Sequence, residues 1–345
     1  EPYGAPQLDV PVRLNVNENP FGPSQSLIDT ISASVATVAA QLNRYPDRDA
    51  IALRTSLADY INKESHTDVS WQEVWAANGS NEVMHHLLQA FGGPGRKLVT
   101  FAPTYSMYEE YCRETFTDFA TVNRSEAFEI TREAVDAALA LNPHILVMCS
   151  PNNPTGTVLD PDVLDYAVAH FDGLIIVDEA YAEFRSPGTD SALVRFAHSD
   201  NVVVTRTMSK AFSCAGLRLG YVVANPSIID ALMIVRLPYH LSAVTQAVAL
   251  AALSHSDELL GQVGTLRTER DALAAWLTSQ NYDVAPSGAN FLLFGKFADR
   301  HAIWQGLLDQ GVLIRETGPA GYLRVSIGTP AENEAFRNAL VATTK

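Results

Sequence analysis

Short apolar runs alternate along the chain with longer stretches in which apolar residues recur at helical spacing. Five runs rich in aliphatic and β-branched residues are each bounded by turn-forming residues: 97–101, 144–149, 173–177, 202–205 and 219–224. Continuous apolar runs of this length are typical of strands that are buried on both faces, with helices as the covering layers. The pattern therefore predicts an α/β fold with a mostly parallel central sheet and helices on both faces.

The two ends of the chain follow a different pattern. The first 23 or so residues are rich in Pro and Asn and predict an extended arm. From residue 256 a long helical pattern is followed by short strand-like and helical stretches. We expect an N-terminal arm (1–35) that joins the smaller domain, a large domain (36–255) and a small C-terminal α+β domain (256–345).

Composition limits the classes of partner. The 345 residues are 47% hydrophobic, enough to bury a large core, and the formal net charge is -15. A negative surface of this size argues against nucleic acid or an anionic membrane as a partner. No apolar stretch approaches the roughly 20 residues needed to span a bilayer, and no signal-peptide pattern is visible.

The cysteines indicate a reducing compartment. Cys112, Cys149 and Cys214 are an odd number without metal-type spacing. We therefore expect a cytoplasmic protein with neither disulfides nor a metal site.

Polar, reactive residues follow three of the apolar runs. Asn153, Asp178 and Lys210 all come shortly after such a run, and ligands of open α/β sheets bind outside the carboxyl ends of the strands. A lone lysine in a loop is usually a solvated charge, whereas in a dry site its pKa falls and it becomes a nucleophile. Asp178 needs a cationic partner if it is buried, unless it is a helix cap or part of a structural ion pair.

Gly79-Ser80-Asn81-Glu82 opens a helical stretch whose free N–H groups could hold a phosphate. In isolation, an ordinary helix cap explains these residues equally well. Neither a GxGxxG motif nor a P-loop is present, so the nucleotide-binding folds lack their fingerprint.

Taken together, these motifs resemble fold-type I pyridoxal-phosphate aminotransferases of class II, and the histidinol-phosphate aminotransferase family most closely. The resemblance covers nearly the whole chain. Its motifs are Asn17-Glu18-Asn19-Pro20, Asn43-Arg44-Tyr45-Pro46, Gly79-Ser80-Asn81-Glu82, residues 150–156, Asp178-Glu179-Ala180-Tyr181, Ser209-Lys210-Ala211-Phe212 with Arg218, residues 237–242, residues 311–315 and residues 323–328.

The resemblance implies a pyridoxal 5'-phosphate site. Lys210 would be the catalytic residue that holds the cofactor as a Schiff base and moves the proton. Asp178 would pair with the pyridine nitrogen, Asn153 and Tyr181 would bind the 3-oxygen, and Tyr105 would stack on the ring. The residues implied for the phosphate are Ser80, Asn81, Thr207, Ser209, Arg218 and, from the other subunit of a homodimer with shared active sites, Tyr45.

The resemblance also implies the substrates, L-histidinol phosphate and 2-oxoglutarate, which give imidazole-acetol phosphate and L-glutamate in histidine biosynthesis. Arg324 would bind a phosphate or a carboxylate in a bidentate pair. Arg315 is a second candidate, with a salt bridge to Glu316 or another acid as the alternative, and Asn19 and Tyr239 are weaker ones. An aromatic amino-acid aminotransferase, a threonine-phosphate decarboxylase and a non-catalytic binding protein on this fold are the competing interpretations.

Overall fold

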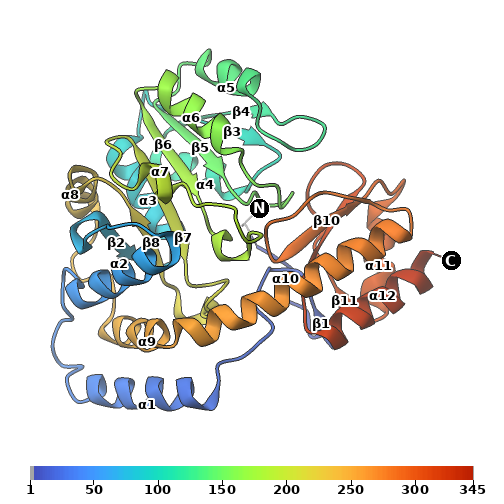
Figure 1. The fold of residues 1–345 in the computed structure, drawn as a ribbon, viewed down its shortest axis with the longest axis horizontal. Coiled ribbons are helices and arrows are strands. Elements are labelled where there is room, and N and C mark those ends of the chain that lie inside the picture. Colours follow the sequence, from blue (N-terminus) through green and yellow to red (C-terminus); the bar gives the residue numbers. More distant parts are fainter. Residues whose placement is uncertain (1–3, 345) are drawn as a thin grey trace.

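The computed structural model describes residues 4–344 and confirms the predicted α/β fold; the outermost residues of the expected first and last domains, 1–3 and 345, lie outside this range. The strands of the central sheet follow the order β2-β8-β7-β6-β5-β3-β4 (Figure 1). Strand β8 is antiparallel to both neighbours, and the other neighbouring pairs are parallel. The bounds are β2 (Val74–Ala77), β3 (Lys97–Ala102), β4 (Asp118–Asn123), β5 (Ile145–Cys149), β6 (Leu174–Asp178), β7 (Val202–Thr207) and β8 (Gly220–Val223).

Both faces of this sheet are buried, which explains its continuous apolar runs. In β5, Ile145 and Val147 belong to one hydrophobic core, whereas Leu146 and Met148 belong to the other. Successive side chains of a strand point to opposite faces, so each strand contributes to both cores. The same alternation sends neighbouring residues at the strand ends to different sides of the sheet.

Helices cover both faces of the sheet (Figure 1). Residues of α3, α4 and α8 form one core with the sheet, and residues of α2, α5, α6, α7 and α9 contribute to the other. The bounds are α2 (Ile51–Ser65), α3 (Gly79–Phe91), α4 (Met107–Thr115), α5 (Arg132–Leu139), α6 (Pro161–His170), α7 (Leu193–Phe196), α8 (Pro226–Val235) and α9 (Ala243–Ser254), with 3-10 turns at Trp71–Glu73, Ala182–Phe184 and Ala215–Leu217.

The smaller unit is built mainly from the C-terminal part of the chain. Strands β12, β10 and β9 form an antiparallel sheet, and β1 from the N-terminal arm pairs in parallel with β11. Helix α10 extends from beside α9 into this unit (Figure 1). The bounds are β1 (Val12–Arg13), α10 (Ser256–Ser279), β9 (Asp283–Val284), β10 (Phe291–Gly295), α11 (Arg300–Asp309), β11 (Val312–Leu313), β12 (Tyr322–Ser326) and α12 (Pro330–Thr344).

The N-terminal arm serves both units. Its strand β1 belongs to the smaller unit, but helix α1 (Gln25–Ala39) packs along α9 of the larger one. The expected boundary at residue 35 falls inside α1, and the boundary at 255 falls between α9 and α10. The division into three parts remains a prediction.

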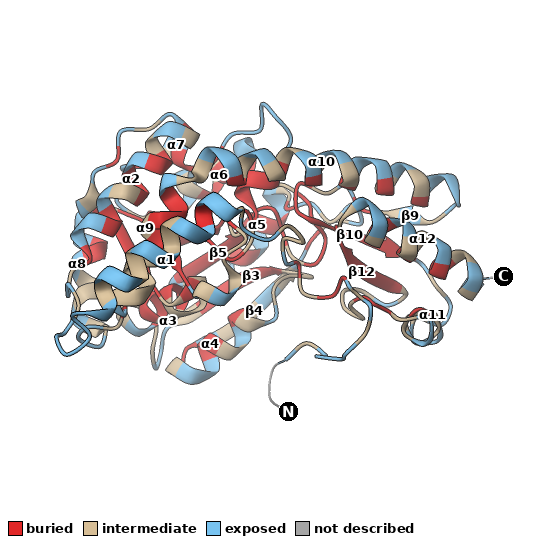
Figure 2. Cartoon of the chain, turned by 90° about the horizontal axis from the view of Figure 1, so that it is seen from below, coloured by how far each residue is buried: buried red, intermediate tan, exposed pale blue. Residues whose placement is uncertain are grey.

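Buried residues are concentrated in the strands of the two sheets and on the helix faces toward them, while the outer faces of the helices are exposed (Figure 2). Helix α1 is the contrast, since Leu27 is its one buried residue. No helix within residues 4–344 combines the length and the apolar character needed to cross a membrane.

Some expected elements differ from those observed. Strands β2 and β4 are absent from the five predicted runs. Strand β4 lies at the edge of the sheet, and each of its residues is either exposed or half-buried. Polar residues are therefore tolerated there. The predicted runs otherwise match β3, β5, β6, β7 and β8 within about two residues, the usual uncertainty of element ends.

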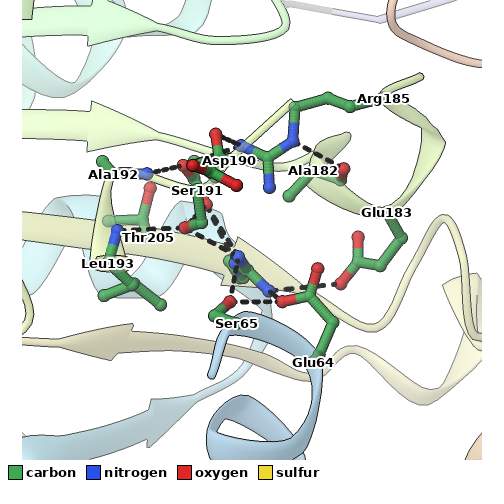
Figure 3. Close-up of polar contacts among 12 residues, drawn as sticks. Glu64, Ser65, Ala182, Glu183, Arg185, Asp190, Ser191, Ala192, Leu193 and Thr205 are labelled. Atoms are coloured by element: carbon green, nitrogen blue, oxygen red, sulfur yellow. Dashed lines mark hydrogen bonds and ion pairs between the residues drawn. The ribbon is translucent and has the colours of Figure 1, made fainter. Parts of the chain in front are cut away.

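A buried cluster of charges lies on the sheet face that carries α2 (Figure 3). At its centre, Arg206 of β7 donates to Glu179 at 2.9 and 3.1 Å and to Glu64 of α2 at 2.7 Å. Glu179 also accepts from Arg185 at 3.2 Å. The fifth charged residue, Glu183, accepts from Tyr60 at 3.1 Å. This cluster joins α2, the end of β6 and β7 into one packed unit.

Candidate active site

A cavity of about 560 Å³ lies at the carboxyl ends of the parallel strands, where the smaller unit meets the central sheet. Its walls come from the segments that follow β3, β5, β6 and β7, from the start of α3, from residues 15–17 of the arm and from residues 315–319 and Arg324 of the smaller unit. Polar residues that are far apart in the sequence therefore share one enclosed space, as expected for an open α/β sheet.

The cavity is positively charged although the chain is acidic. Among the described residues that line it, Asp178 is the one carboxylate, against the cations Lys210, Arg218, Arg315 and Arg324. A cationic cleft in a protein of net charge -15 concentrates field lines and attracts small anions. The arrangement suits a ligand that carries phosphate or carboxylate groups.

Lys210 follows β7 and lies with its amine inside the cavity. The Nζ donates to the carbonyl oxygen of Val16 at 3.0 Å and lies 5.9 Å from the centre of the Tyr181 ring. Burial, reinforced by the charge of Arg324, lowers the pKa of Lys210 to about 8. About a tenth of the amine is therefore uncharged at pH 7, far more than for an ordinary lysine, and is able to act as a nucleophile.

Asp178 ends β6 and is fully buried beneath the cavity. Its Oδ2 accepts from the Tyr108 hydroxyl at 2.6 Å, and its Oδ1 accepts from Thr205 at 3.2 Å and from the Ala180 amide at 3.3 Å. Burial raises the pKa of Asp178, and these three donors act in the opposite direction. No cation is among the groups that shift this pKa, so within the described residues the carboxylate lacks a charged partner.

The start of α3 and Arg218 form the end of the cavity that suits a phosphate. A side chain on Gly79 would meet the Arg218 guanidinium at 2.8 Å, and one on Gly220 would meet the Ser80 amide nitrogen at 2.1 Å. Only glycine allows these segments to approach so closely. Arg218 Nη1 also lies 3.4 Å from the Ser209 hydroxyl, which accepts from Thr207 at 3.0 Å. Free N–H groups, hydroxyls and a guanidinium thus converge on one point.

Asn153, Tyr181 and Arg324 lie together on the side that faces the smaller unit. Arg324 donates to Asn153 Oδ1 at 2.5 Å and to the carbonyl oxygen of Asn15 at 2.9 Å. The Tyr181 hydroxyl accepts from the Asn17 amide at 3.0 Å, which leaves its own proton to be donated into the cavity. Burial raises the pKa of Tyr181 to about 12, so the hydroxyl stays protonated.

Arg315 also lines the cavity, and the predicted alternative pairing with Glu316 is not formed among the described residues. Glu316 pairs with Arg300 at 3.3 Å and with His301 at 2.9 Å instead of with its neighbour in sequence. Arg315 donates to the carbonyl oxygen of Gly4 at 3.1 Å and pairs through its backbone with Arg324. Two guanidinium groups therefore border the same part of the cavity.

Three predicted residues lie outside the cavity of their own chain. Asn19 lines a separate depression of about 250 Å³, and its amide reaches the carbonyl oxygen of Ala211 at 3.4 Å. Tyr45 is 80% exposed and stacks on Tyr239, with ring centres 4.4 Å apart. The neighbouring His240 packs on Trp75, and its Nε2 donates to the Ala76 carbonyl oxygen at 2.8 Å.

Two residues that contact the predicted site were missed as individual candidates. Asn17, recognised only within its motif, adopts a left-handed backbone with φ of 58° and holds the Tyr181 hydroxyl. Tyr108 is wholly buried and holds Asp178. No local pattern marks Tyr108, because Tyr105 precedes α4 and the contact of Tyr108 with Asp178 joins residues 70 positions apart.

The fold and the cavity define a class of enzyme, and comparison with known proteins agrees. The chain belongs to the aminotransferase class I and II family, whose model matches residues 10–340. It is 54% identical, over 99% of its length and 93% of the relative, to the histidinol-phosphate aminotransferase of Thermobifida fusca. It is 51% identical to the Bifidobacterium longum protein of the same name, over 99% of this chain and 93% of that one.

Solved structures show the same architecture. The histidinol-phosphate aminotransferase of Sinorhizobium meliloti, in complex with pyridoxal-5'-phosphate, has a TM-score of 0.85, 22% identity and coverage of 97% and 91%. At this identity the likeness concerns the fold alone. The aspartate aminotransferase of Thermus thermophilus with maleate has a TM-score of 0.81, 25% identity and coverage of 96% and 90%. The predicted fold-type I architecture is therefore confirmed.

Proposed function

We propose that the chain catalyses pyridoxal-phosphate-dependent transamination between L-histidinol phosphate and 2-oxoglutarate, giving imidazole-acetol phosphate and L-glutamate, as a step of histidine biosynthesis. The observation that carries the proposal is one cavity that holds a buried lysine, a buried carboxylate without a cationic partner and three arginines. Relatives that are 51–54% identical over nearly the whole chain bear the name of this aminotransferase.

The residues present fit pyridoxal phosphate. Asp178 is a buried anion that a protonated ring nitrogen would neutralise, and an unpaired buried charge is otherwise costly. Ser80, Asn81 and Arg218 would hold the phosphate at the start of α3. Tyr105, Asn153 and Tyr181 line the cavity; Tyr105 would stack on the ring, and Asn153 and Tyr181 would bind the 3-oxygen. Thr207 and Ser209 also line the cavity and would contribute to the phosphate end of the site.

In this proposal Lys210 serves as both the nucleophile that binds the cofactor and the carrier of the proton. When bound, the cofactor supplies an electron sink for negative charge at the substrate carbon. The Lys210 amine would hold the cofactor covalently and, once displaced by the substrate, would take a proton from the substrate Cα and deliver it to C4′ of the cofactor. Its pKa of about 8 lies near the working range of such a proton carrier.

Arg324 and Arg315 would bind the anionic end of both substrates. A guanidinium pairs in a bidentate manner with phosphate and with carboxylate, so one arginine serves histidinol phosphate and glutamate in turn. Two arginines at this end suit a phosphate dianion. Arg324 is held by Asn153 and by the Asn15 carbonyl, so its direction is set before a substrate arrives. Asn19 and Tyr239 stay weaker predictions, because neither lines the cavity.

The test is a specificity measurement. The purified protein is incubated with 2-oxoglutarate and either histidinol phosphate or phenylalanine, and glutamate formation is followed. We expect a higher kcat/KM for histidinol phosphate, and we expect Arg324→Ala and Arg315→Ala to lower it for histidinol phosphate. Efficient turnover of phenylalanine without turnover of histidinol phosphate would contradict the substrate assignment. Loss of carbon dioxide without glutamate formation would indicate a decarboxylase.

Lys210→Ala tests the catalytic assignment directly. We expect turnover to fall by at least about a thousandfold, because one residue serves as both nucleophile and proton carrier. Borohydride reduction of the native protein should attach the cofactor covalently to Lys210, and peptide mapping identifies the site. Lys296→Ala, at an exposed lysine that pairs with Asp283, is the matched control and should keep native turnover. Labelling at another lysine would refute the assignment.

A homodimer with shared active sites is part of the proposal. Tyr45 is not among the residues that line its own cavity, and it presents an exposed ring, stacked on Tyr239. Large apolar side chains are also exposed on nearby segments of the chain: Leu42, Ile51, Ile234 and Leu237. An exposed apolar group of this kind marks a protein interface. We propose that Tyr45 reaches the phosphate in the cavity of the partner.

Subunit mixing tests this arrangement. Tyr45→Ala and Lys210→Ala proteins are each expected to be impaired, and in a hybrid dimer one of the two sites regains both native residues. After dissociation and reassociation, the mixture should exceed the summed activity of its components. Absence of any gain, with hybrid dimers shown to form, would contradict shared sites.

We also propose a cytoplasmic location. Cys112, Cys149 and Cys214 are all free thiols in the structure, and Cys112 and Cys149 are buried. Reduced cysteines are the rule where thiol reductants are abundant. Fractionation of cells that produce the protein would test this proposal.

A further inference from the structure

The hydrogen bonds around Asp178 are unequal. Oδ1 shares two donors, Thr205 at 3.2 Å and the Ala180 amide at 3.3 Å, whereas Oδ2 accepts the Tyr108 hydroxyl at 2.6 Å. The Tyr108 bond is thus the shortest of the three. A short bond from a hydroxyl to a charged oxygen is among the strong hydrogen bonds of proteins. Tyr108 is therefore the dominant donor to this carboxylate.

Tyr108 remains a donor at any working pH. Its side chain is wholly buried in the core between α3, α4 and the sheet. Burial, together with the negative charge of Asp178, raises the pKa of Tyr108 well above its ordinary value of 10.0. The phenol therefore keeps its proton, and the proton points to the carboxylate.

Tyr108 lies only three residues after Tyr105, which is part of the cavity wall. Tyr105 lines the cavity, and Tyr108 follows it in the first turn of α4. The two rings meet edge to face, with centres 5.6 Å apart and planes at 89°. The segment thus presents one aromatic side chain to the cavity and places a hydroxyl behind Asp178. A shift of α4 would move both together.

We propose that Tyr108 is a positioning residue for the proposed transamination: its hydroxyl on Oδ2 keeps the Asp178 carboxylate charged and directed into the cavity. The inference rests on the proposed function, since the charge matters only if a cationic ring nitrogen is bound there. The physical reason is competition between two effects. Removal from water favours the neutral acid, and donors to the carboxylate favour the anion. Burial already raises the pKa of Asp178, and without the Tyr108 donor this pKa would rise further.

Other titratable groups near Asp178 do not replace this donor. Glu179 of its own segment acts on it through its charge, the charge of Asp178 acts on the neutral Cys149 and Tyr181, and Lys210 lines the same cavity. Burial raises the pKa of Cys149 to about 12, so this thiol stays neutral. Glu179 is itself an anion and raises the pKa of Asp178. Hydrogen bonds therefore carry the stabilisation of the Asp178 anion.

The experiment compares Tyr108→Phe with Tyr111→Phe. Tyr111 lies on the same helix and is also buried, but it is not among the donors to Asp178, so it controls for the loss of a buried hydroxyl. The affinity of the full-length apoprotein for pyridoxal phosphate is measured across a pH series. The titration of the free cofactor is common to all variants, so differences between variants belong to the protein.

We expect a pH-dependent loss in Tyr108→Phe. At the acidic end of the series its affinity should be about tenfold to a hundredfold weaker than native, the loss expected for one hydrogen bond to a charged group. The two affinities should converge at alkaline pH, where the carboxyl is ionised in both proteins. In the loaded enzyme kcat should fall while KM for the amino donor is unchanged. Tyr111→Phe should follow the native curve.

The outcomes separate this inference from the proposed function. If native protein does not bind pyridoxal phosphate, the proposed function fails. If native protein binds it and Tyr108→Phe is weaker by the same factor at every pH, or equals Tyr111→Phe, Tyr108 has only a structural role and this inference is refuted. Should Tyr108→Phe not fold, Thr205→Val decides: a smaller shift in the same direction supports the inference, and no shift overturns it.

Discussion

Asp178 and Glu179 are neighbours in sequence, and both carboxylates are buried, yet they lie in opposite environments. Asp178 accepts from neutral donors only, and its pKa is raised by burial. For Glu179, burial also acts to raise the pKa, but the charges of Arg185 and Arg206 outweigh it, and the pKa is lowered. Strand alternation sends the two side chains to different faces of the sheet.

The contrast distinguishes a structural charge from a charge prepared for a ligand. Glu179 has its cations within the chain, so the cluster is complete in the folded protein. Asp178 has none, and a buried anion without a cation is destabilising until one arrives. Perturbed carboxylates of the second kind are concentrated at functional sites. The neighbouring strand β7 shows the same contrast: the neutral Thr205 donates to Asp178, whereas the cationic Arg206 donates to Glu179.

The largest effect should come from Asp178→Asn. Turnover should fall by about a hundredfold or more, since the charge that a ring nitrogen requires is removed. The free energy of unfolding of the apoprotein should change by no more than about 1 kcal/mol, because no ion pair is broken. Steady-state kinetics and denaturant titration measure the two quantities. A large loss of stability with native turnover would show that Asp178 is a structural charge and not one that binds a ligand.

Glu179→Gln should show the opposite pattern. Arg185 and Arg206 would be left buried with less negative charge, and the loss of one partner of a buried ion pair costs about 3–5 kcal/mol. Denaturant titration measures this loss. Turnover per folded molecule should remain close to native. If Glu179→Gln is as stable as native protein, the cluster does not hold β6 and β7 together as the structure indicates.

A smaller, pH-dependent effect is expected at Glu183. Burial raises its pKa from 4.5 to about 7, with the charge of Arg206 acting against the shift. The folded state therefore binds a proton that the unfolded state releases, and stability falls as pH rises from about 4.5 through 7. The whole loss is about 3 kcal/mol, given 1.36 kcal/mol for each pKa unit.

Glu183→Gln tests this pH dependence, because glutamine is neutral at every pH. The difference in unfolding free energy between native protein and variant should change between about pH 4.5 and 7 and be constant at higher pH. The other titratable groups are common to both proteins and cancel. A difference that is independent of pH would show that Glu183 does not titrate in this range.

Much of the fold was predictable, because it depends on local patterns. The runs that became β3, β5, β6, β7 and β8 are long and apolar on both faces, which is the pattern of a covered parallel sheet. Strand β4 was missed because an edge strand carries polar residues like those of a loop. The short β2 was missed as well, and it pairs only with the antiparallel β8.

The candidate site was predictable to a lesser degree. Lys210, Asp178 and Arg218 follow from motifs, and the structure places them around one cavity. Tyr45 and Tyr239 lie on the outer surface, and no local pattern reveals that they stack on each other. Tyr108 lies in a helix without a local motif, and only its contact with Asp178, 70 residues away, makes it part of the site.

The sequence by itself determined the α/β class, the family and the residue types available for chemistry, because periodicity and motif order are properties of the chain. The tertiary structure decided which buried charges are neutralised within the chain and which are not. That distinction depends on contacts between segments far apart, such as Arg206 with Glu64 and Glu179. Asp178 and Glu179 are both acids at the end of one apolar run, and only the packing of the two sheet faces separates their roles.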